Sequence, residues 1–80
     1  MEQFGARLKT LRKLRELSRH ALADKAEVAY HTIYKYETGE ILPTAYVLRK
    51  ISIALDVSAD VLLGLRPLTA DDAANILNLR

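Results

Sequence analysis

Apolar residues recur every three or four positions along most of the chain, which is the spacing of one buried face on an amphipathic helix. This pattern and its breaks predict five helices: residues 2–15, 19–26 and 30–37, a fourth beginning after Thr44, and a short fifth beginning after Ser58. Ser18, Thr44 and Ser58 are suitable N-caps, because a hydroxyl accepts an amide proton left unpaired in the first turn. We therefore predict a compact all-α fold of five helices.

Each predicted helix has its own inward-facing positions. They are Phe4, Leu8 and Leu11 in the first helix, Leu22, Ala23 and Ala26 in the second, Ile33 and Tyr36 in the third, Val47, Leu48, Ile51, Ala54 and Leu55 in the fourth, and Val61, Leu62 and Leu63 in the fifth. Gly39 and Gly64 are placed to end the third and fifth helices, because glycine accepts the left-handed conformation common at a helix end. The stripe on the fourth helix is strong and is predicted to form the floor of the core.

About three residues separate the second predicted helix from the third. Such a short connection forces the two helices to cross at a steep angle. A helix pair of this size suits insertion into a DNA groove.

Two short motifs flank this corner. The first is L-S-x-x-x-L-A, formed by Leu17, Ser18, Leu22 and Ala23, and the second is T-I-x-x-Y-E-x-G, formed by Thr32, Ile33, Tyr36, Glu37 and Gly39. Together with Pro43 they make the chain from about Phe4 to Leu63 resemble the Cro/C1-type (Xre family) helix-turn-helix domain of small bacterial and phage regulators. The resemblance implies a lambda-repressor-like domain over residues 1–64. It leaves residues 65–80 as a short C-terminal tail, with helical spacing in part, for packing or dimerisation.

The resemblance implies that the third helix enters the major groove of double-stranded DNA. The family's base-reading positions and their neighbours fall on Tyr30, His31, Thr32, Tyr34 and Lys35. Lysine donates to guanine O6 and N7, whereas tyrosine contacts phosphate or packs on a thymine methyl. The alternative for Tyr30 and Tyr34 is a partly buried packing role, and Tyr36 is expected in the core.

Backbone phosphates are expected at the N-terminus of the second helix, where free amides and the helix dipole favour an anion. The phosphate-binding residues implied by the resemblance are Ser18 and Arg19 there, and Thr38 and Gly39 after the third helix. Family members often have glutamine where this chain has Arg19. The resemblance also implies a structural ion pair between Arg12 and Glu37, with two independent surface charges as the alternative.

Two corner residues depart from the family pattern. Glu27 stands where glycine is usual, and a left-handed backbone there costs a side chain about 1 kcal/mol. Ala29 stands at the usual Ser or Thr cap of the third helix, which loses about another 1 kcal/mol. We predict a looser corner within the same fold.

The formal net charge of +2 conceals a polarised distribution. Residues 1–50 hold ten Lys or Arg against six acids, whereas residues 51–80 hold two against four. Six basic residues gather before or at the start of the second helix, with Glu16 among them: Arg7, Lys9, Arg12, Lys13, Arg15 and Arg19. This run favours a phosphate-facing surface, and a merely solvated helix face is the alternative.

Composition narrows the function further. Half of the 80 residues are hydrophobic, which argues against disorder, and the absence of cysteine indicates a reducing, cytoplasmic compartment. No apolar run approaches the roughly 20 residues of a membrane helix. His20 and His31 are too few for a zinc site, and no phosphate loop or nucleophile elbow is present. We expect no cofactor, no metal and no enzymatic activity.

These patterns predict a sequence-specific DNA-binding transcriptional regulator, and repression of transcription is favoured over activation. A homodimer on DNA is expected, because paired helices reach successive major grooves about 34 Å apart. The alternative is an antitoxin-like or other protein-interaction module. Its partner would engage Ile41, Leu42 or the apolar residues of the C-terminal tail.

Overall fold

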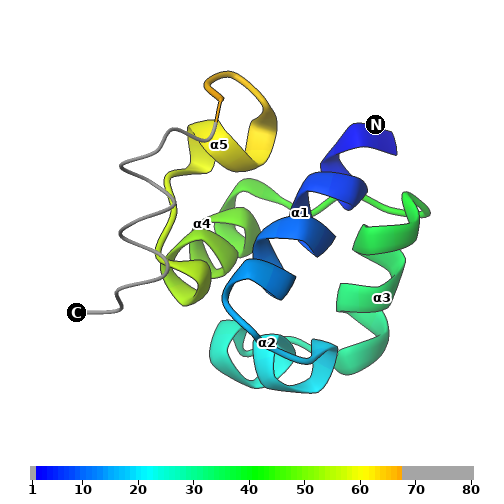
Figure 1. Ribbon diagram of the computed structural model, residues 1–80. Coiled ribbons are helices and arrows are strands. Elements are labelled where there is room, and N and C mark those ends of the chain that lie inside the picture. Colours follow the sequence, from blue (N-terminus) through cyan, green and yellow to red (C-terminus); the bar gives the residue numbers. More distant parts are fainter. Residues whose placement is uncertain (1, 68–80) are drawn as a thin grey trace.

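The computed structural model describes residues 2–67, and every regular element within that range is an α-helix. The helices are α1 (Glu2–Leu14), α2 (Arg19–Ala26), α3 (Tyr30–Thr38), α4 (Ala45–Leu55) and α5 (Ala59–Leu63) (Figure 1). The predicted all-α, five-helix fold is confirmed over this range. The predicted end of the first helix is one residue too late and that of the third one residue too early. The predicted tail beyond residue 67 lies outside the described residues, as does its packing or dimerisation role.

The predicted N-caps are confirmed. Ser18, Thr44 and Ser58 each have an extended backbone, and their hydroxyls accept the amide protons of Ala21, Val47 and Val61. Ala29 holds the same position before α3 but makes no side-chain cap bond. The start of α3 therefore lacks a stabilising bond that α2, α4 and α5 have.

Left-handed residues end the helices. Gly39 (φ 83°) follows α3 and Gly64 (φ 78°) follows α5, as predicted. Glu27 (φ 60°) ends α2 in the same conformation although it carries a side chain. Glu16 (φ 58°) and Asp56 (φ 55°) are also left-handed, which the sequence pattern did not indicate.

The core receives at least one fully buried large side chain from each helix: Phe4, Leu8, Leu22, Ile33, Ile51, Leu55 and Leu62. In α4 only Ile51 and Leu55 are buried, and the rest of its stripe packs against the core while partly exposed. The inward placement of Leu63 is wrong, because this residue is 36% exposed. An α-helix has about 3.6 residues per turn, so three consecutive apolar positions cannot all point toward the core. In the five-residue α5, Leu63 is the position that is left facing outward.

Gly5 brings α1 against α3. A Cβ atom at this position would lie 2.5 Å from the carbonyl oxygen of Glu37 and 2.7 Å from that of Tyr36. At Gly5 the backbones of the two helices are therefore in direct contact, with no side chain between them. Figure 1 shows α1 beside α3. This contact holds the first turns of α1 close to the last turn of α3.

Candidate functional site

The corner between α2 and α3 is formed by residues 27–29. Glu27 turns the chain, with its amide donating to the Asp24 carbonyl oxygen at 3.2 Å, and Val28 donates to Ala23 at 3.0 Å. Leu22 and Ala26 of α2 and Ile33 of α3 are fully buried behind the corner. The core therefore holds the two helices in one relative orientation.

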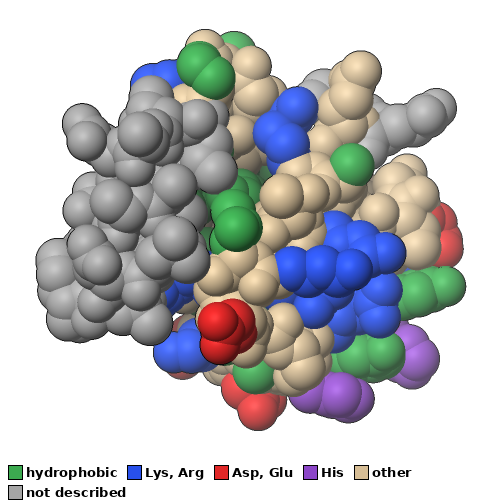
Figure 2. All heavy atoms as spheres, in the orientation of Figure 1, with side chains coloured by type: hydrophobic (Ala, Val, Ile, Leu, Met, Phe, Trp, Pro, Cys, Tyr) green, Lys and Arg blue, Asp and Glu red, His purple; other side chains and the backbone are tan. Residues whose placement is uncertain are grey.

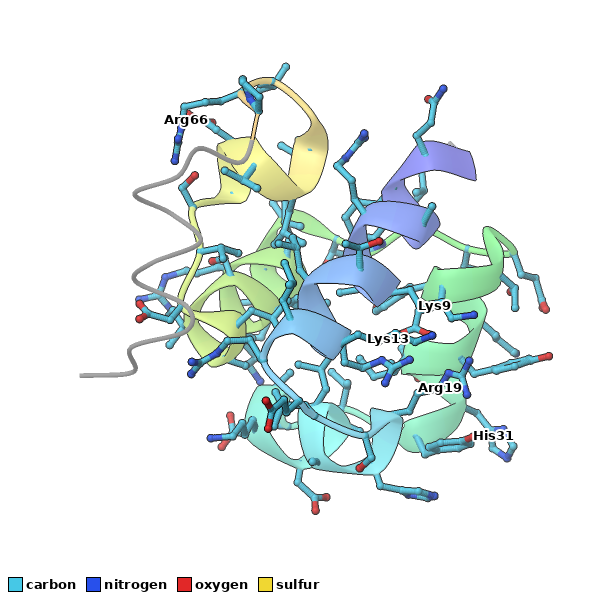
Figure 3. All side chains as sticks on the ribbon, viewed as in Figure 1. Lys9, Lys13, Arg19, His31 and Arg66 are labelled. Atoms are coloured by element: carbon cyan, nitrogen blue, oxygen red, sulfur yellow. The ribbon has the colours of Figure 1, made fainter. Side chains whose placement is uncertain are left out.

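The face of α3 that points away from the core contains His31, Tyr34 and Lys35, which are exposed, as is Thr38 in the last turn. Tyr34 is 46% exposed, and His31 projects clear of the ribbon in Figure 3. Ile33 and Tyr36 anchor the opposite face in the core, as predicted, and burial raises the pKa of the Tyr36 hydroxyl. Thr32 is half-buried between these faces. An exposed polar face on a firmly anchored helix is suited to contact with an external ligand.

Tyr30 at the start of α3 lies between two histidines. Its ring stacks on His20 of α2, with centroids 4.0 Å apart and planes at 15°, and meets the edge of His31 at 5.7 Å. Tyr30 is half-buried in this arrangement. Its ring therefore packs between the two helices and still reaches the surface. The part played by His20 was not anticipated, because the stack joins residues of different helices.

Glu37, in the last turn of α3, is the centre of a buried ionic cluster. Arg12 donates through Nε to Oε2 at 2.6 Å and through Nη2 to Oε1 at 3.2 Å, so the structure brings this expected pair together. The Glu37 and Arg12 side chains are only 2% and 8% exposed. Arg12 also donates through Nη1 to the carbonyl oxygen of Leu17 at 2.8 Å, just before α2. The cluster thus joins α1, α3 and the approach to α2.

Arg19, at the start of α2, is the third member of this cluster. Its Nε donates to Oε1 of Glu37 at 2.9 Å, and this bond raises the pKa of the Arg19 guanidinium. The side chain is 30% exposed, and its guanidinium carbon lies 5.4 Å from the centre of the Tyr34 ring. Arg19 is therefore held between a buried carboxylate and an exposed ring of the α3 surface.

The other residues expected to bind phosphate already make hydrogen bonds within the protein, Ser18 as an acceptor and Thr38 and Gly39 as donors. The Ser18 hydroxyl accepts from Ala21 N at 3.0 Å. The Thr38 hydroxyl donates to the Lys35 carbonyl oxygen at 3.1 Å, and the Gly39 amide donates to that of Tyr36 at 3.2 Å. An anion at the end of α3 would compete with these carbonyl oxygens.

The basic run before α2 is divided by the fold, so the expectation of one surface of six basic residues is wrong. Arg7 turns to α5, where Nε donates to the Leu62 carbonyl oxygen at 3.0 Å. Arg12 is buried, as described above. Lys9 and Lys13 are exposed and lie with Arg19 on the side of α1 that borders α3 (Figure 3). Figure 2 shows a patch of Lys and Arg side chains there, bordered by histidine.

Within residues 2–67, no group of three His, Cys, Asp or Glu side chains is arranged to hold a metal ion. In the same range, no helix has the length and apolar character needed to cross a membrane.

Comparison with known proteins identifies the family of the chain. A helix-turn-helix family model matches residues 8–62, which is more than half of the chain. No curated protein matches the sequence. The matched range contains α2, the corner, α3 and both partners of the Arg12–Glu37 ion pair. The chain belongs to the Cro/C1-type helix-turn-helix family of DNA-binding regulators.

Proposed function

We propose that this protein is a sequence-specific, double-stranded DNA-binding transcriptional regulator that reads the major groove with α3. The observation that carries the proposal is the outward face of α3, on which His31, Tyr34 and Lys35 are exposed while Ile33 and Tyr36 hold the helix in the core. Side chains that project from a rigid helix can meet base edges in a fixed register, which is what sequence reading requires.

The proposed roles follow from the chemistry of each side chain. Lys35 donates to guanine O6 and N7, and His31 offers a ring nitrogen to a base edge. Tyr34 contacts phosphate or packs on a thymine methyl, and the half-buried Tyr30 and Thr32 border this surface. Arg19 and the first amides of α2 hold a backbone phosphate, aided by Ser18 at the cap of α2 and by Thr38 and Gly39 at the C-terminal end of α3.

The regulator acts as a homodimer on DNA in this proposal. Two copies related by a two-fold axis would place their α3 helices in successive major grooves, about 34 Å apart, on an inverted repeat. Occupancy of such a site at a promoter excludes polymerase, so repression is the favoured outcome.

Selection from a random duplex pool at near-physiological salt tests the function. Recovery of an inverted repeat with half-site centres about 10 bp apart would support a dimeric reader of sequence. Recovery of no motif would contradict it, since charge-driven binding alone carries no base preference.

A second candidate, a protein-interaction module, is favoured by the loop between α3 and α4. Ile41 and Leu42 are adjacent there and 41% and 53% exposed. If a protein partner is the principal ligand, Leu42→Asp should abolish partner capture and Lys35→Ala should leave it intact. Duplex selection with the wild type would then return no motif.

A further inference from the structure

We propose that Lys9 and Lys13 of α1 form an additional phosphate-binding site, which holds the DNA backbone beside the groove read by α3. This site lies outside the helix-turn-helix itself. The inference rests on the proposed function, because its ligand is the phosphate backbone of the bound duplex.

Helical geometry places both lysines on the flank of α1 that borders α3. Residues four apart on a helix lie one above the other, with Cβ atoms about 5–6 Å apart, so Gly5, Lys9 and Lys13 form one row. The first member of this row contacts α3, since a Cβ atom on Gly5 would lie 2.5 Å from the Glu37 carbonyl oxygen. Lys9 and Lys13 are exposed at the outer edge of the same flank.

The last residue of this row, Lys13, lies close to the start of α2. The Lys13 carbonyl oxygen accepts the Glu16 amide at 2.9 Å in the turn that precedes Ser18. Figure 3 shows Lys9, Lys13 and Arg19 gathered on one side of α3, and Figure 2 shows Lys and Arg side chains forming a patch there. A DNA strand held at Arg19 would therefore pass along the flank of α1.

The position of these lysines is fixed relative to α3. Gly5 removes any side chain between the two backbones, and Arg12, next to Lys13 in the chain, is joined to Glu37 of α3 by two hydrogen bonds. A phosphate site built on α1 would consequently keep its register with the base-reading face. That register is what a backbone contact contributes to sequence recognition.

The charge of the row is uncompensated within the protein. Among the described residues, neither Lys9 nor Lys13 has an acidic side chain within ion-pair distance, and Glu37 is engaged by Arg12 and Arg19. Like charges four residues apart destabilise a helix slightly. A phosphate between them removes that repulsion, which makes this flank a better anion site than a single surface lysine.

The salt dependence of DNA binding tests the proposal. The variant Lys9→Gln/Lys13→Gln removes both charges, and Arg49→Gln/Lys50→Gln removes two charges from α4, which lies on the other side of α1 from α3 in Figure 1. Fluorescence anisotropy from 50 to 200 mM KCl would use the labelled duplex that the wild type selects and a scrambled duplex of equal length. Circular dichroism would first verify that both variants are folded.

We expect the plot of log affinity against log salt to be shallower by about 1.8 for Lys9→Gln/Lys13→Gln, because each phosphate contact contributes about 0.9. Over this salt range, the wild type would then lose on the order of tenfold more affinity than the variant. The loss of slope should be equal on the selected and scrambled duplexes, with the base preference retained. The Arg49→Gln/Lys50→Gln control should keep nearly the wild-type slope.

A slope for Lys9→Gln/Lys13→Gln that equals the slope of the α4 control would overturn the α1 site. Failure of the proposed function has a different signature, in which the wild type selects no motif and binds selected-pool and scrambled duplexes alike. In that case the slopes on the scrambled duplex still decide whether Lys9 and Lys13 contact phosphate.

Discussion

Arg19 and Glu37 are joined across the two helices of the DNA-binding motif by a hydrogen bond of 2.9 Å from Nε to Oε1. The same carboxylate also receives two bonds from Arg12, so one buried acid holds two guanidinium groups. Glu37 therefore has two functions in the fold. It neutralises the buried Arg12, and it orients a residue proposed to bind DNA.

Replacement of Glu37 by glutamine should lower the free energy of unfolding by about 3–5 kcal/mol, because it leaves Arg12 buried without a counter-charge. Arg19→Ala should lower it by less than about 1 kcal/mol, since Arg19 is partly solvated and its ion pair is screened. Urea denaturation followed by circular dichroism measures both. Equal, small decreases in the free energy of unfolding of the two variants would contradict the prediction, because they would show that Arg12 without its counter-charge does not destabilise the fold.

In DNA binding, Lys35 and Arg19 should have separable effects. Lys35→Ala is expected to relax base preference at a cost of about 1–3 kcal/mol, because an exposed lysine on α3 would donate to a base edge. Arg19→Ala should weaken binding to every duplex similarly and make the salt slope shallower by about 1. Titration of both variants against selected and scrambled duplexes distinguishes the roles. Equal losses on all duplexes for both variants would contradict the assignment.

Gly5→Ala should destabilise the protein even though alanine is the better helix former by up to about 1 kcal/mol. The new Cβ would lie 2.5 Å and 2.7 Å from two backbone oxygens of α3, which cannot move aside as a flexible side chain can. Overpacking of this kind costs about 1–3 kcal/mol. Thermal and urea unfolding would measure the change, with Ala6→Gly on the exposed side of α1 as the propensity control. A stabilised Gly5→Ala protein would mean that α1 and α3 are not in close contact.

Glu27→Gly should raise the free energy of unfolding by about 0.5–1 kcal/mol. The left-handed backbone of Glu27 (φ 60°, ψ 43°) is strained for a residue with a Cβ, and part of the gain is offset by the greater freedom of glycine in the unfolded chain. Its 3.4 Å ion pair with Lys50 contributes little, because the Glu27 side chain is 75% exposed and the pair is screened by solvent. Asp56→Gly should gain less, because aspartate accepts this conformation more readily. A Glu27→Gly melting temperature at or below that of the wild type would refute the prediction.

Stability should fall above pH 10 in part because of Tyr36. Burial raises the pKa of its hydroxyl above the ordinary value of 10.0, so the folded protein keeps a proton that the unfolded chain releases. The contribution is complete below pH 10.0 and is lost as the pH rises through the folded-state pKa. Urea midpoints between pH 8 and 11 should therefore decline less steeply for Tyr36→Phe than for the wild type. Tyr46→Phe, at a position 65% exposed, serves as the control and should follow the wild-type slope. If the urea midpoints of Tyr36→Phe and the wild type fell equally with pH, Tyr36 would not contribute to the loss of stability.

The local elements were readable from the sequence because their causes lie within a few residues of one another. Ser18 caps α2 through a bond to Ala21, three positions away, and Ile33 and Tyr36 share one helix face for the same reason. The motif around the corner likewise depends on spacing within α2 and α3. The five helices to within a residue at the predicted ends of α1 and α3, most of the core positions and the family followed from these short-range patterns.

Only the tertiary structure decided which basic residues are buried, which bind the end of α5 and which lie on the surface beside α3. Arg7 meets Leu62 across 55 positions, and Arg19 meets Glu37 across 18. The fit of Gly5 against α3 and the stack of His20 on Tyr30 are likewise contacts between helices. Such contacts depend on the crossing angles and separation of whole helices, which result from packing of the complete core and are not encoded in any local periodicity.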